Sequence, residues 1–134
     1  MYSDPISEMT TKIYNAQVAN KPDVTIGYSK MKESILNILK DKGFVQDFSI
    51  ESYTSNSDIK QIHVVLKYTS DRKPVINGIK RVSKPSRRVY HSVEDIKPIM
   101  NGFAVGIYST NRGILTDKQA KKENIGGEYL FYIW

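Results

Sequence analysis

The chain has 134 residues, of which 40% are hydrophobic and 25% charged. This composition is typical of a globular protein that is long enough to bury a core in one domain or two small ones. Twenty basic against fourteen acidic side chains give a net charge of +6. The absence of cysteine excludes disulfides, cysteine-bound zinc, iron–sulfur clusters and thiol catalysis.

The first half of the chain predicts the order α-β-α-β-β. Asp4 and Pro5 suit the start of a helix that continues to about Asn20. Ser29 is suited to cap a second helix and Gly43 to end it. The two apolar stripes at helical spacing are Ile6, Met9, Ile13 and Ala16, then Met31, Ile35, Ile38 and Leu39. The expected strands are Val24–Tyr28, one with Phe44, Phe48 and Ile50 on one face, and Ile62–Tyr68, the last two joined by a polar loop over Ser52–Lys60.

The second half predicts mostly strands with short helices, after a linker over Thr69–Pro74. The expected strands are Val75–Ser83, Arg87–His91, one with Phe103, Val105 and Ile107 on one face, and Glu128–Trp134. The last is apolar on both faces and should be either central in its sheet or part of an interface. Val93–Ile99 is expected to be a short helix at most, closed by Asn101 and Gly102. A second short helix is expected over Lys118–Asn124, capped by Thr116 or Asp117. We therefore predict an α+β fold of two small domains, residues 1–70 and 71–134.

The net charge lies entirely in the second half. Residues 1–68 hold eight basic and eight acidic side chains, whereas residues 69–134 hold twelve and six. Between Thr69 and Arg88 only Asp71 is acidic, against seven basic side chains: Arg72, Lys73, Lys80, Arg81, Lys84, Arg87 and Arg88. So local an excess favours a polyanion such as nucleic acid as partner. A solvated surface that keeps the protein soluble is the alternative.

Motifs for catalysis or metal binding are weak or absent. Ser29 and Lys32 match the Ser-x-x-Lys pattern of penicillin-binding enzymes, but the companion motifs are missing and a helix cap explains the serine. His63 and His91 sit in strand patterns and are expected to have surface or cross-strand roles. No Walker loop, Gly-x-Ser-x-Gly or dinucleotide-binding motif occurs, and Gly126-Gly127 is expected to be only a turn. We predict no catalytic residue, no metal and no cofactor.

The turn Ser109–Gly113 offers two hydroxyls, an amide, a guanidinium and a glycine within five residues. Short polar side chains on a tight loop can enter the shallow minor groove of A-form RNA and bond to 2′-hydroxyls and base edges. Within this turn Ser109, Thr110 and Asn111 supply such groups, Gly113 lets the backbone come close, and Arg112 suits a phosphate. The alternative is that this segment is an ordinary β-turn, which has the same composition. Glu128 is expected either to accept a hydrogen bond from a base amine or to order this loop by accepting hydrogen bonds from the loop's N–H groups.

Further residues complete the predicted RNA-binding set. Lys80, Lys84, Arg87 and Arg88 are expected to contact phosphates. Ser86 and Tyr90 belong to the same segment. Lys30 and Lys32, in the first turn of the second helix, predict a weaker second contact. Four tyrosines lie among the basic strands, and each either stacks on an unpaired base or lines the core: Tyr90, Tyr108, Tyr129 and Tyr132.

Several blocks of residues also follow one another in a distinctive order. They are Asp4–Met9, Asn15-Ala16, Ser29–Lys32, Ile35-Leu36, Gly43-Phe44, Gly78–Pro85, Arg88–Tyr90, Ser109-Thr110, Gly113–Asp117, Ala120-Lys121, Gly126–Glu128 and Tyr132–Trp134. In this order and spacing they resemble the bacterial family of the eighth protein of the small ribosomal subunit, over nearly the whole chain. The sequence departs from the usual family pattern at Tyr14, Tyr108, Asn111 and Phe131.

The resemblance implies a structural constituent of the small ribosomal subunit that binds ribosomal RNA directly. In that family the second domain, through its Ser-Thr loop, docks on an irregular helix of the RNA central domain, and the first domain adds contacts. Several members also bind their own operon's messenger RNA and repress its translation. The neighbouring proteins implied are the fifth and twelfth of the small subunit. We expect a cytoplasmic protein without a signal peptide, with no membrane partner, that is a monomer off the ribosome.

Two other classes of function stay open from the residues alone. A small nuclease also binds polyanions, but it needs a clustered general base or a metal-binding set of carboxylates. The acidic residues considered near the Ser109–Gly113 loop are Asp117 and Glu128, and Asp117 is better suited to cap a helix. A protein–protein adaptor with incidental basicity is the third class, and it would bind RNA without the steep salt dependence of phosphate contacts.

Overall fold

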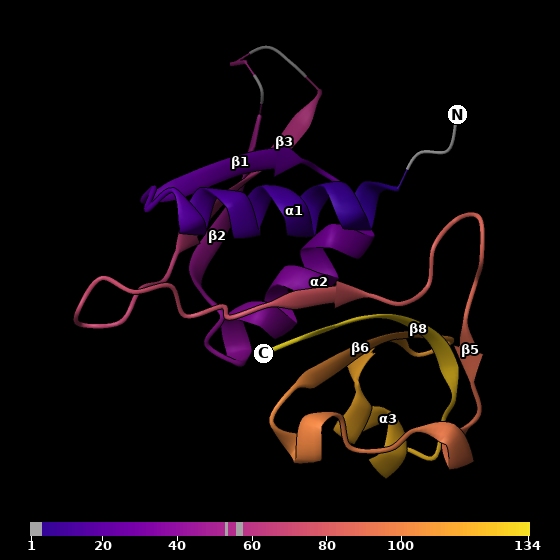
Figure 1. The fold of residues 1–134 in the computed structure, drawn as a ribbon. Helices are drawn as coiled ribbons and strands as arrows, with labels where there is room; N and C mark the ends of the chain where they lie inside the picture. The colour runs from indigo at the N-terminus through magenta and orange to yellow at the C-terminus, as the bar shows by residue number, and fades with distance from the viewer. Residues whose placement is uncertain (1–3, 53, 56–57) are drawn as a thin grey trace. The chain divides into compact units, whose positions relative to one another are not determined.

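The computed structural model describes residues 4–52, 54–55 and 58–134, so part of the predicted loop Ser52–Lys60 lies outside the described residues. The chain divides into two compact units, Glu8–Ile76 and Asn77–Trp134, the second including the N-terminal residues up to Ser7. The predicted α+β fold is confirmed (Figure 1). No helix in the described ranges is long and apolar enough to cross a membrane.

The first five elements follow the predicted order. They are α1 (Pro5–Val18), β1 (Asp23–Gly27), α2 (Lys30–Asp41), β2 (Val45–Ser52) and β3 (Lys60–Leu66). The strands form an antiparallel sheet in the order β1-β3-β2. Its core contains buried apolar residues from both helices and all three strands, including Met9, Ile13, Ile26, Leu39, Val45 and Val64.

Local signals place the helix ends where the sequence predicts them. Asp4 Oδ1 accepts a hydrogen bond from Ser7 N at 3.2 Å, and Ser29 Oγ accepts one from Lys32 N at 3.2 Å. After α2, Gly43 adopts a positive φ of 81°, and Phe44 N donates to Leu39 O at 2.8 Å. This is the Schellman ending, which satisfies carbonyls that the helix itself leaves free.

Burial in this half differs from the prediction at two places. Met31 is exposed, because α2 buries Ile35, Leu36 and Leu39 instead. Ile50 is exposed as well, although the alternating pattern placed it on a buried face. Its partner Ile62 on the central strand β3 is buried, so Ile50 does face the core side of the sheet. Its exposure follows from its position on β2, which is an edge strand.

The second unit is built around one central strand. Its elements are β4 (Ile79–Arg81), β5 (Tyr90–His91), β6 (Val105–Thr110), β7 (Gly113–Thr116), α3 (Asp117–Lys122), β8 (Gly127–Ile133), and the single 3₁₀ turns η1 (Val93–Asp95) and η2 (Met100–Gly102). The strand β8 pairs antiparallel with β4, β5 and β6, and β7 pairs with β6. Of the two positions predicted for the last strand, the structure shows the central one.

Two predicted strands are much shorter than expected. Only Ile79–Arg81 of the segment Val75–Ser83 is a strand, because Asn77 and Gly78 both donate to the single carbonyl of Trp134 at the end of β8. Only Tyr90–His91 of Arg87–His91 pairs with β8, because the preceding residues close a tight turn. The predicted linker Thr69–Pro74 is likewise a closed turn, with a bridge between Tyr68 and Pro74.

The predictions around Val93–Phe103 were also partly wrong. The expected helix Val93–Ile99 is a single 3₁₀ turn over Val93–Asp95, since Pro98 disfavours helical geometry in the residue before it. Phe103 is 67% exposed and lies outside the strand, which begins only at Val105. The alternation of Phe103 with Val105 and Ile107 therefore does not mark one buried face.

Two of the four tyrosines belong to the core of the second unit. Tyr108 and Tyr129 are buried, and their rings stack with centroids 4.6 Å apart. The Tyr108 hydroxyl lies 3.0 Å from His91 Nδ1. Tyr90, by contrast, is 68% exposed. Of the two roles predicted for these tyrosines, core packing applies to Tyr108 and Tyr129, and only Tyr90 is fully available to stack on a base.

These buried tyrosines predict a loss of stability at alkaline pH. Burial raises the pKa of Tyr108 and Tyr129 above the ordinary value of 10.0, with neighbouring Asp117 and tyrosines adding to it. Both stay protonated in the folded protein, whereas the unfolded chain releases the protons above about pH 10. Each should then lower the free energy of unfolding by about 1.4 kcal/mol per pH unit above that pH.

Urea unfolding between pH 8 and 11 measures this dependence. The variants Tyr108→Phe and Tyr129→Phe should each reduce the alkaline slope, and Tyr90→Phe is the control at an exposed position. Equal slopes in all four proteins would contradict the assignment.

Candidate nucleic-acid interface

One row of the second unit's sheet brings together predicted site residues from three separate parts of the chain. Glu128 on β8 is in register with Tyr90 on β5 and with Ser109 on β6. Residues opposite one another in antiparallel strands place their side chains on the same face. The row therefore joins the exposed Tyr90 to the start of the Ser109–Gly113 loop, a proximity that no sequence pattern shows.

The loop itself is a hairpin turn between β6 and β7. Thr110 pairs with Gly113, so Asn111 and Arg112 form its tip. The Thr110 hydroxyl donates to Gly113 O at 2.8 Å and accepts from Arg112 N at 3.1 Å. Gly113 has a φ of 105°, which favours glycine. Thr110 therefore holds the turn together rather than pointing a free hydroxyl outward.

Two other side chains of the loop keep their hydrogen-bonding groups available. Within the described part of the chain, the side chains of Ser109 and Asn111 make no hydrogen bond, whereas Arg112 lies 3.9 Å from Glu123 in an exposed ion pair. Asn111 is exposed and Ser109 half-buried. Of the predicted reading groups, these two are the ones that the turn does not use.

The predicted phosphate-binding residues surround a second tight turn. Lys84 and Arg87 exchange two backbone hydrogen bonds of 3.0 Å, which place Pro85 and Ser86 at the tip. Lys84, Ser86, Arg87 and Arg88 are all exposed, and so is Lys80 on β4. We call residues 84–88 the basic turn.

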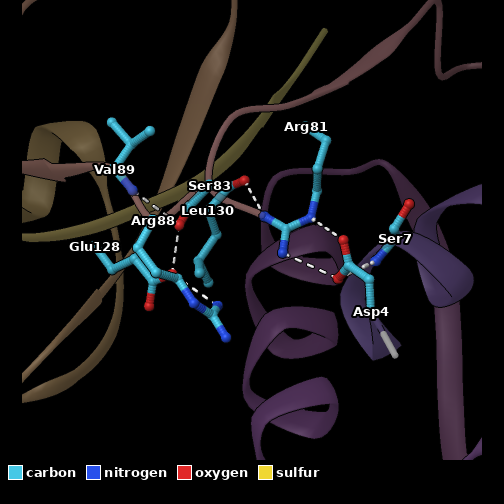
Figure 2. A network of polar contacts seen from close by, with 8 residues as sticks. All are labelled: Asp4, Ser7, Arg81, Ser83, Arg88, Val89, Glu128 and Leu130. Carbon is cyan, nitrogen blue, oxygen red and sulfur yellow. Dashed lines mark hydrogen bonds and ion pairs between the residues drawn. The ribbon is translucent and has the colours of Figure 1, made fainter. Parts of the chain in front are cut away.

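A small network joins the basic turn to the central strand (Figure 2). Glu128 Oε2 accepts hydrogen bonds from Ser83 Oγ and from Arg88 Nη1, the latter at 3.0 Å. Ser83 is buried, and its hydroxyl also accepts from Val89 N at 3.1 Å. The Glu128 side chain is only 16% exposed. Glu128 thus holds the ends of the basic turn together.

This network changes the roles predicted for two residues. Of the two roles predicted for Glu128, ordering the Ser109–Gly113 loop through the loop's N–H groups is not seen, because its carboxylate contacts among the described residues go to Ser83 and Arg88. Arg88 was expected mainly to contact phosphates, but one nitrogen of its guanidinium, Nη1, already forms an ion pair with Glu128. Ser83 was missed altogether, because a serine between a valine and a lysine in a strand carries no distinguishing pattern.

Arg81 belongs to the basic segment by sequence but not to its free surface. Its Nη2 lies 3.1 Å from Asp4 Oδ1, and its Nε lies 3.3 Å from Asp4 Oδ2 (Figure 2). Nη1 donates to the carbonyl of Leu130. The side chain is 11% exposed, so its role is to fix Asp4 to β4 and β8 within the second unit.

Gly126 and Gly127 are more than the simple turn that we expected. Gly127 opens β8, and a Cβ atom there would lie 2.3 Å from Ser109 O. A Cβ atom on Gly126 would lie 2.5 Å from His91 O. Both distances are far inside van der Waals contact, so only glycine allows β5, β8 and β6 to approach at this row.

Lys30 and Lys32 belong to the other unit, at the first turn of α2. Lys30 is exposed, and Lys32 Nζ donates to Gly27 O at 3.3 Å. The first turn of a helix presents free N–H groups that favour anions. The structure therefore places both lysines as the sequence predicts, while one of them already has a backbone partner.

The acidic and histidine side chains of the described residues form no group of three that could hold a metal ion. His63 lies 3.0 Å from Asp23 and 3.9 Å from Glu51, which come from the strands on either side of β3. The cross-strand role predicted for His63 is thus confirmed. Asp117 is buried with Oδ1 accepting from Gly106 N at 3.2 Å, while Thr116, not Asp117, caps α3.

Comparison with known proteins identifies the family. The model of the family described as ribosomal protein S8 matches residues 4–134. The chain belongs to this family. It is 47% identical to the small ribosomal subunit protein uS8 of Mycoplasma mobile, a match that covers 98% of this chain and 96% of the relative. The uS8 protein of Persephonella marina is 43% identical over the full length of both chains. That of Paraburkholderia xenovorans is 45% identical, covering 98% and 97%.

Membership of the S8 family confirms three of the predictions. The protein is a structural component of the small ribosomal subunit, it acts in translation, and it is not an enzyme. The relatives span the same length as this chain, so both structural units belong to the family's protein.

Proposed function

We propose that this protein binds small-subunit ribosomal RNA directly, in the central domain, and that the second unit is the main RNA-binding surface. The observation that carries the proposal is the row Tyr90–Glu128–Ser109, which sets the Ser109–Gly113 loop beside the basic turn. An exposed aromatic ring, short polar groups that the loop does not use and the exposed cations of the nearby basic turn together suit RNA, which proteins recognise through stacking, 2′-hydroxyls and phosphates.

The functional experiment is chemical protection of small-subunit RNA by the full-length protein. We expect protection of one discrete helix in the central domain, with the strongest effect at an irregular or unpaired position, because a regular A-form major groove hides its base edges. Protection spread evenly over all helices would mean that the protein binds RNA only through its charge.

The phosphate contacts can be tested separately. Lys84→Ala and Lys80→Ala should each weaken binding to cognate and generic RNA alike, and should reduce the slope of log affinity against log salt by about one. The control is Arg72→Ala, which also removes one positive charge. Arg72 is exposed, lies outside the basic turn and packs over the ring of Tyr68. If the Lys84 and Lys80 variants match this control in both affinity and slope, the basic turn only solubilises the protein.

The first unit contributes a weaker contact in this proposal. Lys30 and Lys32 at the start of α2 would meet a phosphate, which also relieves the unfavourable position of cations at a helix N-terminus. The double variant Lys30→Ala with Lys32→Ala should lose less affinity than Lys84→Ala. No loss at low salt would remove these residues from the RNA surface.

Further partners follow from the same surface. A messenger RNA that folds like the ribosomal helix would bind the same loop, so repression of the protein's own operon is part of the proposal. The fifth and twelfth small-subunit proteins are the proposed neighbours. A reporter fused to the operon's leader tests repression: its translation should fall when the protein is overproduced, and Ser109→Ala with Asn111→Ala should restore it.

A nuclease finds little support in this geometry. Glu128 is held by Ser83 and Arg88, and Asp117 is buried against the Gly106 amide. Neither carboxylate is free to act as a general base. Incubation with labelled RNA and Mg²⁺ should leave the RNA intact, and cleavage that Glu128→Gln abolishes would overturn this conclusion.

A further inference from the structure

A separate recess lies between α3 and the segment before η2. It has a volume of about 420 Å³ and is lined by Ile96, Lys97, Pro98, Asp117, Lys118, Lys121 and Lys122. The atoms exposed inside it are mainly carbon, from Ile96, Pro98 and the lysine stems. This volume suits one or two side chains, and neither the Ser109–Gly113 loop nor the basic turn contributes to the lining.

The walls of the recess are fixed by contacts of their own. Lys121 Nζ donates to Val93 O at 2.9 Å, which joins α3 to the segment opposite. Asp117 Oδ1 accepts from Gly106 N, and Ile96 is buried in the cluster that includes Ala120 and Tyr108. Because both walls are anchored, the recess is present before any partner binds, which lowers the entropic cost of binding.

Cations surround this apolar floor. Lys97, Lys118, Lys121 and Lys122 are all exposed, and in the described part of the chain none of them forms an ion pair with a carboxylate. The nearest acidic side chains in sequence on the opposite wall are Glu94 and Asp95, of which Asp95 accepts from Ser92 Oγ. Four cations around carbon-lined walls are complementary to a partner that is both acidic and apolar.

We propose that this recess binds an acidic segment of a neighbouring protein, which inserts an aliphatic or aromatic side chain between Ile96 and Pro98 while its carboxylates meet the four lysines. RNA fits less well, because the lining offers carbon atoms but no aromatic ring on which a base can stack. A second copy of this chain fits less well because each copy carries a net charge of +6. The inference does not depend on how the protein binds RNA.

The test uses the full-length, ¹⁵N-labelled protein and two synthetic acidic peptides of ten residues, identical except for a central leucine or serine. The leucine peptide should shift the amide signals of residues 96–97 and 117–122 and bind at least tenfold more tightly than the serine peptide. Lys118→Glu with Lys122→Glu should weaken it at least tenfold. Lys42→Glu with Lys73→Glu, which makes the same charge change on the other unit, should leave the affinity within twofold.

Three results would overturn the proposal. Equal binding of the two peptides would show that the apolar floor is not used. Shifts of the same signals by a short single-stranded RNA, with no effect of either peptide, would assign the recess to RNA. Equal losses in both double variants would show that only the overall charge of the protein attracts the peptide.

Discussion

Replacing Ser109 and Asn111 with alanine is expected to weaken binding to the cognate RNA helix by about 1–3 kcal/mol for each residue, the usual cost of leaving buried polar partners unpaired. These two are the short polar side chains of the loop that make no hydrogen bond inside the described part of the protein. They are therefore free to bond to base edges and 2′-hydroxyls across the shallow minor groove. Filter binding or calorimetry at fixed salt measures the loss.

Selectivity distinguishes this effect from a loss of charge or of fold. Neither substitution changes a charge, so binding to a generic RNA duplex should scarcely change. Thr110→Val is the matched control, because the Thr110 hydroxyl bonds within the turn to Gly113 and Arg112. Its loss should destabilise the loop and so weaken binding to cognate and generic RNA alike. Equal losses on cognate and generic RNA for Ser109→Ala and Asn111→Ala would make the loop a phosphate clamp rather than the reader of the RNA.

Local sequence signals were sufficient for the helix ends and for the loop. Asp4, Ser29 and Gly43 act through neighbours within a few residues, so their roles follow from short-range geometry. The same holds for Ser109–Gly113, whose turn is closed by Thr110 and Gly113. Helix ends and tight turns depend on contacts between residues a few positions apart, so the local sequence is enough to predict them.

Long-range register could not be predicted in this way. The register shift between Val45 and Asp47 brings Phe48 and Ile50 opposite the buried Val64 and Ile62, and the carbonyl of Trp134 ends the ladder at Asn77 and Gly78. The contacts of Ser83 and Arg88 with Glu128 span 45 and 40 residues. Such contacts depend on how strands pair, and single-residue preferences do not determine that pairing.

The charge of the basic segment illustrates the same limit. Counting seven cations between Thr69 and Arg88 predicts a polyanion partner, but it treats all seven as equivalent. In the structure Arg81 is bound to Asp4 and Leu130, and Arg88 shares its charge with Glu128. Of the other five, which are all exposed, Arg72 and Lys73 belong to the first unit, and Lys80, Lys84 and Arg87 are those of the second unit left for phosphates. The structure thus separates cations that build the surface from cations that can bind on it.

Glu128→Gln is expected to act in opposite directions on the two kinds of RNA. Removing one negative charge beside the basic turn should raise affinity for generic duplex RNA a few-fold, since phosphate binding rises with positive charge. The same change weakens the hold on Ser83 and Arg88, so the turn is less well ordered before binding. Affinity for the cognate helix should fall by about tenfold, or about 1.4 kcal/mol.

The matched control for this variant is Glu123→Gln, which removes the same charge close to the Ser109–Gly113 loop. Glu123 is exposed and lies 3.9 Å from Arg112, a separation at which an exposed ion pair contributes little to stability. This control should raise affinity for cognate and generic RNA together, because it adds positive potential without releasing an anchor. If the two variants change the ratio of cognate to generic affinity equally, Glu128 acts only through its charge. If Glu128→Gln lowers the ratio of cognate to generic affinity and Glu123→Gln does not, the Glu128 carboxylate must position the basic turn. Charge alone cannot lower the affinity for one RNA while raising it for another.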